Sequence, residues 1–156
     1  MNKIRKILAP TDYSELSCAG LRHAFETARE LGAELIVLHV VSMSDDWFST
    51  HEGFSPVRDL MAQQKEFLDK FLREKFAESM NVVEVRQKIE LGNPYSNIAD
   101  LAEREAVDLM VMSTHGRTGL DHILLGSVTE KVIAHAPCPV LAIPAPKRHV
   151  ALSKVA

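Results

Sequence analysis

The stretch from residue 113 to 129 carries the residue types that bind an anion. It reads STHGRTGLDHILLGSVT, and combines glycines, hydroxyl side chains and basic side chains. Glycine lets the backbone come close to a phosphate group, and the N–H groups at a helix N-terminus attract negative charge. Ser127 and Thr129 would add hydroxyl donors, and His115 and Arg117 would add positive charge. The pattern favours a phosphate-binding loop that leads into a helix.

A purely structural role for the same stretch stays open. Gly116 and Gly119 would also serve to shape a turn. Ser127 and Glu130 match a capping box, in which the two side chains cap the start of a helix. Glu130 adds negative charge in the first helical turn, which opposes a phosphate there. The sequence contains neither G-x-x-x-x-G-K-[ST] nor G-x-G-x-x-G, so two common phosphate motifs are excluded.

A second group of candidates, Pro10, Thr11 and Asp12, follows the first apolar run. The carboxylate of Asp12 would hydrogen-bond a ribose or a base, or hold a metal ion that is bound to phosphates. Alternatively, Asp12 and Ser14 only start the first helix. We favour the ligand role, because the strand order derived below puts the end of this strand at a crevice.

Strand-like and helix-like segments alternate along the chain, which predicts an α/β fold with a parallel sheet. Short aliphatic runs predict five strands, at 4–9, 35–41, 82–91, 109–112 and 140–143. The segments between them have helical periodicity, around residues 21–31, 60–76, 94–102 and 127–133. We expect Gly32 to end the first helix, and Asn93 with Pro94 to begin the third.

The character of each strand predicts its place in the sheet. The runs at 4–9, 35–41 and 109–112 are apolar on both faces and belong in the interior. The run at 82–91 alternates apolar and charged residues, which is typical of an edge strand. The order 3-2-1-4-5 satisfies this and gives a doubly wound, five-stranded parallel sheet with helices on both faces. Ligands of such sheets bind where the order changes direction, here between strands 1 and 4.

The fifth strand is apolar, although this order places it at the other edge. An uncovered apolar edge invites pairing with another chain. We therefore expect a homodimer through strand 5, formed by Val140, Leu141, Ala142 and Ile143. In the alternative arrangement, the tail at 145–156 folds over the edge.

Length and composition limit the classes of function. The chain has 156 residues, of which 46% are hydrophobic and 25% charged, so we expect a single domain over 1–156 with a tail at 145–156. A net charge of −3 argues against nucleic-acid binding, and no apolar run is long enough to insert into a membrane. The two cysteines, Cys18 and Cys138, form no disulfide framework, which favours a reduced cytoplasmic protein.

Several of these segments together resemble the universal stress protein family. The resemblance rests on ILAPTDYS at 7–14, LHV at 38–40, GNP at 92–94, the glycine-containing stretch after residue 113, and PCPVL at 137–141. It covers residues 3–143. It implies a five-stranded parallel sheet of order 3-2-1-4-5 and dimers formed through the last strand.

One branch of that family binds ATP through the pattern G-x2-G-x9-G-[ST]. Here the pattern falls on Ser113, Gly116, Gly126 and Ser127, with serine in the first position. If that position needs a left-handed backbone, serine costs about 1–2 kcal/mol. If the position only needs room beside the ribose, serine fits there.

The resemblance also implies roles for individual residues. The adenosine would be surrounded by Pro10, Thr11, Asp12 and, through its backbone, Val40. The phosphates would be held by Gly116, Gly126, Ser127, Val128 and Thr129. The predicted nucleotide-binding set is completed by Met112, Ser113, His115 and Arg117.

We therefore expect a protein of stress response or signalling that binds ATP, ADP or AMP with Mg2+ or Mn2+. The phosphates would hold the metal ion, with Asp12 as a possible side-chain ligand. Two other functions stay open. One is a ligand-free dimeric interaction module. The other is a slow ATPase, for which no convincing base beyond Asp12 is present to orient a nucleophile.

Overall fold

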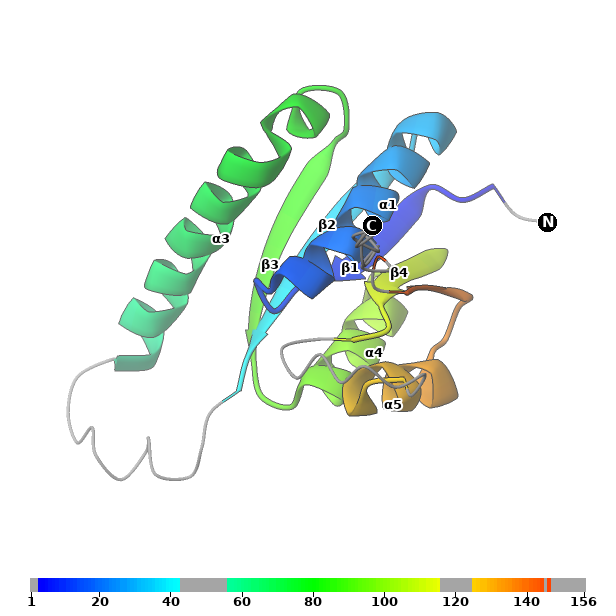
Figure 1. Cartoon of the computed structure of the whole chain (residues 1–156). Coiled ribbons are helices and arrows are strands. Elements are labelled where there is room, and N and C mark those ends of the chain that lie inside the picture. Colours follow the sequence, from blue (N-terminus) through cyan, green and yellow to red (C-terminus); the bar gives the residue numbers. More distant parts are fainter. Residues whose placement is uncertain (1–2, 43–55, 116–124, 145, 147–156) are drawn as a thin grey trace, which may run out of the picture.

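The computed structural model describes residues 3–42, 56–115, 125–144 and 146. Within these ranges, strands and helices alternate (Figure 1). The elements are β1 (Lys6–Pro10), α1 (Glu15–Leu31), β2 (Glu34–Val41), α3 (Pro56–Met80), β3 (Val85–Leu91), α4 (Pro94–Arg104), β4 (Leu109–Ser113), α5 (Ser127–His135) and β5 (Val140–Ile143). No helix in the described ranges is long and apolar enough to cross a membrane.

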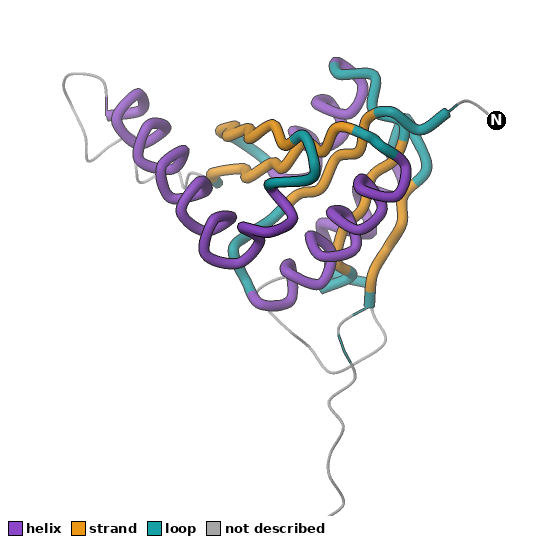
Figure 2. The backbone as a smooth tube through the Cα atoms, turned by 90° about the horizontal axis from the view of Figure 1, so that it is seen from above, coloured by secondary structure: helices purple, strands orange, loops and turns teal. Residues whose placement is uncertain are grey.

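The strands form one parallel sheet of order β3-β2-β1-β4-β5, which confirms the predicted topology. Helices cover both faces of the sheet (Figure 2). Alternate residues of β2 divide between the two faces: Leu35 and Val37 pack with α1 and α3, whereas Ile36 and Leu38 pack with α4 and α5. This period of two follows from strand geometry and gives the protein two apolar layers.

The predicted ends of two helices are confirmed. Gly32 ends α1 in the left-handed conformation, at φ 61°, and its N–H donates to the carbonyl of Ala28. Asn93 caps α4 by accepting a hydrogen bond from the N–H of Tyr95, and Pro94 is the first helical residue. Both ends fit the known preferences for glycine after a helix and proline at its start.

The predicted capping box at Ser127 and Glu130 is wrong. Helix α5 begins with Ser127 itself, Gly126 occupies the N-cap position, and no side chain caps the helix. The carbonyl of Gly126 already accepts the N–H of Glu130 at 3.0 Å, so the helix starts one residue earlier than the box requires. The first turn of α5 therefore has no side-chain cap.

Strand β3 lies at the edge, as predicted, but begins at Val85 rather than at residue 82. The N–H groups of Val82 and Val83 donate to the carbonyl of Ser79, which closes the end of α3 and delays the strand. On the charged face of β3, Arg86 bonds Glu105 at 2.8 Å. This guanidinium lowers the pKa of the Glu105 carboxyl.

Candidate functional site

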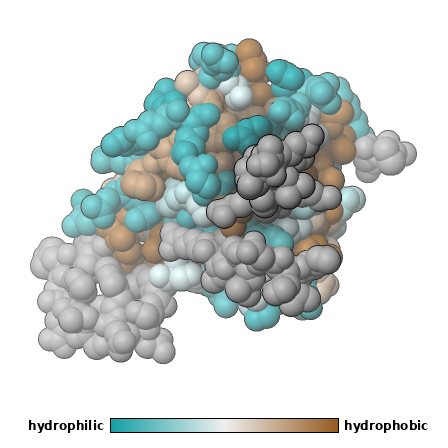
Figure 3. Space-filling model, viewed as in Figure 1, coloured by the Kyte–Doolittle hydropathy of each residue, from teal (hydrophilic) through white to brown (hydrophobic). Residues whose placement is uncertain are grey.

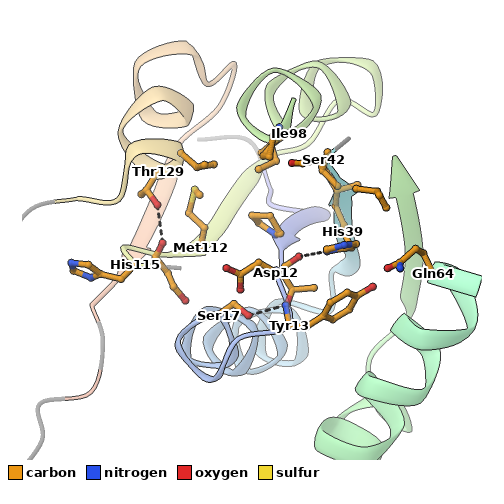
Figure 4. A pocket seen from close by; sticks show the side chains of 18 of the residues that line it. Asp12, Tyr13, Ser17, His39, Ser42, Gln64, Ile98, Met112, His115 and Thr129 are labelled. Atoms are coloured by element: carbon orange, nitrogen blue, oxygen red, sulfur yellow. Dashed lines mark hydrogen bonds between the residues drawn. The ribbon is translucent and has the colours of Figure 1, made fainter. Parts of the chain in front are cut away.

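A cavity of about 610 Å3 lies at the carboxyl ends of β1, β2 and β4. This is the place where the strand order changes direction, as the sequence predicts. The pocket extends to both faces of the sheet. Ile98 and Val128 line it from the side of α4 and α5, and Tyr13 and Phe67 line it from the side of α1 and α3. Ile98 and Tyr13 lie on opposite sides of the pocket in Figure 4.

Most of the residues predicted to bind the nucleotide line this cavity. They are Pro10, Thr11, Asp12, Val40, Met112, Ser113, His115, Val128 and Thr129. Gly126 and Ser127 stand immediately before the lining residues of α5, at the start of that helix. Gly116 and Arg117 lie outside the described residues, as do most of the predicted tail and residues 43–55 after β2.

Asp12 takes part in the start of α1 and also lines the cavity. Its Oδ1 accepts hydrogen bonds from the N–H and hydroxyl of Ser14, at 3.0 and 2.5 Å. Ser14 in turn caps α1 by accepting from the N–H of Ser17 at 3.1 Å. Asp12 therefore helps to start the helix, and it also lines the cavity. The contacts with Ser14 hold the carboxylate in a fixed position in the wall of the cavity.

Tyr13 has an unusual backbone next to this carboxylate. Its φ is 65°, in the left-handed region that a bulky residue rarely adopts. Its ring lies 4.2 Å from the ring of His39 and 4.7 Å from that of Phe67. The buried His39 ring approaches the Thr11 carbonyl through Nδ1 at 2.8 Å. Residues with such strained backbones cluster at functional sites, because only a well-packed surrounding keeps them there.

Ser113 ends β4 and connects three parts of the site. Positive φ occurs among the described non-glycine residues only at Tyr13 and Ala106, so serine costs no left-handed strain here. The Ser113 hydroxyl donates to the carbonyl of Leu16 at 2.7 Å and accepts from the N–H of Gly20 at 3.0 Å. The side chain therefore bonds to the backbone of α1.

The same residue also holds the start of α5. The hydroxyl of Thr129, which is only 4% exposed, donates to the carbonyl of Ser113 at 2.9 Å. The N–H of Gly126 donates to the carbonyl of Thr114 at 2.7 Å. These bonds fix the first turn of α5 against the end of β4. Its uncapped N–H groups and the helix dipole favour an anion at this point.

The backbone of Val40 faces the crevice. The N–H of Thr11 donates to the carbonyl of Leu38, and the N–H of Gly92 donates to that of Val41. Peptide groups of successive strand residues point to opposite sides, so those of Val40 point, like those of Leu38, toward β1. Because β1 ends at Pro10, opposite Leu38, the N–H and C=O of Val40 face the space beyond its end.

The predicted nucleotide-binding set leaves out ten of the described residues that line the cavity, and two of these ten come from α3. Gln64 and Phe67 of α3 line the cavity. Their helical spacing indicates only a face that packs on the sheet, and Leu68 and Phe71 on that face are indeed buried. The helical spacing in α3 does not distinguish a residue that packs against the sheet from one that extends beyond the sheet into the pocket.

The described residues contain no group of three histidine, cysteine, aspartate or glutamate side chains placed to hold a metal ion. Both cysteines are free thiols. Burial is the main cause that raises the pKa of the Cys18 and Cys138 thiols, so the reactive thiolate is disfavoured.

Comparisons with known proteins show what this chain is similar to. A universal stress protein of Methanocaldococcus jannaschii is 39% identical over 149 residues, which cover 94% of this chain and 86% of the relative. The structure of a universal stress protein from Lactobacillus plantarum superposes with a TM-score of 0.73, at 24% identity, over 92% of this chain and 99% of that one.

A further solved structure is a universal stress protein in complex with cAMP. It superposes with a TM-score of 0.64, at 20% identity, over 93% of this chain and all of the other. The universal stress protein family as a whole matches residues 3–144. The chain therefore belongs to the universal stress protein family.

Proposed function

We propose that this protein binds ATP at the strand ends of β1 and β4 and acts in stress response or signalling through that bound nucleotide. The observation that carries the proposal is the arrangement of three kinds of group around one cavity. An outward-facing peptide at Val40, a fixed carboxylate at Asp12 and the uncapped start of α5 surround the same space.

Each group matches one part of the nucleotide. The N–H and C=O of Val40 complement the adenine edge, on which a ring nitrogen accepts and the amino group donates. The carboxylate of Asp12 accepts hydrogen bonds from ribose hydroxyls. The helix start with Gly126, Ser127, Val128 and Thr129 favours the phosphates. The relative solved with cAMP supports the ligand class, because it shows that this fold is able to hold an adenine nucleotide.

A divalent cation fits this arrangement as part of the ligand. Mg2+ and Mn2+ prefer oxygen ligands and are often held by one carboxylate together with substrate phosphates. Asp12 is the carboxylate that lines the cavity, so the phosphates would supply most of the ligands. The ion would offset phosphate charge beside α5, where Glu130 is the acidic residue of the first turn.

Titration of nucleotide-free protein with ATP and Mg2+ in a calorimeter tests the proposal. We expect a micromolar dissociation constant, which corresponds to about −8 kcal/mol. ADP and AMP, measured in the same way, give the contribution of the terminal phosphates. The absence of heat, together with no competition against a fluorescent ATP analogue, would exclude nucleotide binding and leave the interaction module as the function.

The position of β5 at the edge of the sheet supports a homodimer. Among the residues that the structure describes, only β4 pairs with this strand, and Leu141 on it is 42% exposed. We expect Leu141→Lys to convert a dimer to a monomer, because a lysine on an edge strand blocks edge-to-edge pairing. Light scattering at high protein concentration measures the mass. Val82→Lys, at a hydrophobic residue that is 64% exposed before β3, is the matched control and should leave the dimer intact.

A monomeric mass for the unsubstituted protein would contradict the dimer and favour the tail as the cover of this edge. The two free thiols also fit a reducing compartment, so we place the protein in the cytoplasm.

A further inference from the structure

We infer that α3 recognises the base of the nucleotide, with the amide of Gln64 bonding the 6-amino group of adenine and Phe67 forming the adjacent wall. This inference rests on the proposed nucleotide site. It extends that site to a helix that carries none of the residues of the glycine pattern. It therefore assigns base selectivity to side chains rather than to the Val40 backbone alone.

The order of groups along the pocket gives the direction of the ligand. Thr129 and His115 lie at one end, Asp12 lies in the middle, and His39 and Gln64 lie at the other end (Figure 4). A nucleotide runs from phosphate through sugar to base. Phosphates at α5 and a ribose at Asp12 leave the base for the far end. The edge of the base that is opposite the sugar then faces His39 and Gln64.

Helix α3 presents an aromatic wall at that end. Gln64 and Phe67 are three residues apart, so they lie on one side of the helix, and both line the pocket. Phe67 meets the ring of Tyr13 edge-on, with centroids 4.7 Å apart, and Tyr13 lies 4.2 Å from His39. These rings form a surface of the kind that packs against a planar base.

The exposure of Phe67 is unusual for this helix. Hydrophilic residues cover much of the outer surface of α3 (Figure 3), while Leu68 and Leu72 are fully buried beneath it. Phe67 falls in neither group, because it is 52% exposed and yet contacts the core through Tyr13. A ligand base in the pocket would cover the part of the ring that the protein leaves open.

Gln64 supplies the polar group on this wall. Its side chain is half-buried, and no hydrogen bond joins its amide to another described residue. A glutamine amide bonds adenine in a bidentate way, because its oxygen accepts from the 6-amino group while its nitrogen donates to N7. The second hydrogen of that amino group would remain for the carbonyl of Val40. The two contacts therefore select a 6-amino over a 6-oxo purine.

Calorimetric titration with two nucleotides tests the inference. The ligands are ATP and purine riboside triphosphate, which lacks the 6-amino group. We expect Gln64→Leu to weaken ATP binding about tenfold, and to weaken binding of the second ligand only about two- to threefold. Phe67→Ala should weaken both ligands to the same extent, because it removes apolar contact and no hydrogen bond. Gln63→Leu, at the exposed neighbouring glutamine, is the matched control and should change neither affinity.

The outcomes separate this inference from the proposed function. If Gln64→Leu binds ATP as tightly as the unsubstituted protein, or loses the same factor for both ligands, base recognition by Gln64 is overturned and the nucleotide site stands. If the unsubstituted protein binds neither ligand, the proposed function fails and the inference fails with it. Far-UV circular dichroism of each variant verifies that α3 and the sheet are intact.

Discussion

Replacing Gly126 with valine is expected to abolish ATP binding while the protein still folds. A Cβ atom at this position would lie 3.0 Å from the carbonyl oxygen of Thr114, closer than nine in ten real Cβ contacts. That oxygen belongs to backbone held by β5, since the N–H of Thr114 donates to the carbonyl of Ile143. The start of α5 must therefore move away from β4, and the valine side chain adds bulk beside the proposed phosphate site.

The size of this effect follows from the bonds that the phosphates would lose. A hydrogen bond to a charged group contributes about 1.5–3 kcal/mol, so the loss of two weakens ATP binding about a hundredfold or more. Calorimetry measures this loss. Gly32→Ala is the control, because Gly32 has φ 61° and no neighbour within 4 Å of an added Cβ. It should destabilise the fold by about 1 kcal/mol and leave the affinity unchanged. Unaltered ATP affinity in the Gly126 variant would refute α5 as the phosphate site.

Replacing Gly20 with alanine is expected to destabilise the whole protein, although helix propensity alone predicts the opposite. Alanine is favoured over glycine inside a helix by about 1 kcal/mol. Here, however, the added Cβ would lie 2.8 Å from the backbone nitrogen and 2.9 Å from the hydroxyl of Ser113. Overpacking of this kind costs about 1–3 kcal/mol, and a rigid backbone neighbour places the cost at the upper end. We expect a net loss of about 1–2 kcal/mol in the free energy of unfolding.

Urea unfolding of a double-mutant cycle with Ser113→Gly apportions this loss. Removing the hydroxyl relieves one of the two close contacts, so the double variant should recover part of the stability but not all of it. Ser113→Gly alone also removes the bonds to Leu16 and Gly20, which reduces stability by about 1–2 kcal/mol. A Gly20→Ala protein as stable as the original would show that α1 does not press against β4 at this point.

The strand order was predictable because the edge strand β3 differs from the interior strands in its polarity pattern. The alternation along 82–91 identifies an edge, and the apolar runs around Ile7, Ile36 and Met110 identify the interior. Because the crossover connections between parallel strands are right-handed, few strand orders then remain. The position of the pocket follows from the order alone. Asp12 and Thr129 could be proposed from sequence, because both stand at strand or helix ends next to this point.

Contacts across large sequence separations could not be predicted in the same way. The sequence raises the possibility that serine at position 113 replaces a glycine beside the ribose, yet the hydroxyl bonds α1 instead. The capping box at Ser127 fails because the bond between Gly126 and Thr114 moves the helix start. Gln64 joins the pocket because of how α3 lies over the sheet edge. Each outcome depends on tertiary placement, which local spacing does not encode.

The hydroxyl of Ser113 has a consequence for the order in which the protein folds. It joins β4 to α1 across 97 positions of sequence, between Leu16 and Ser113. Contacts between residues so far apart in sequence form slowly, because the entropy cost of closing a large loop comes before the contact stabilises the chain. The binding crevice therefore takes shape only when β2, β1 and β4 have paired in the sheet. A partly folded or newly synthesised chain would lack it, and ligand capture would report a completed fold. Once present, the ligand would raise the free energy of global unfolding rather than that of one loop.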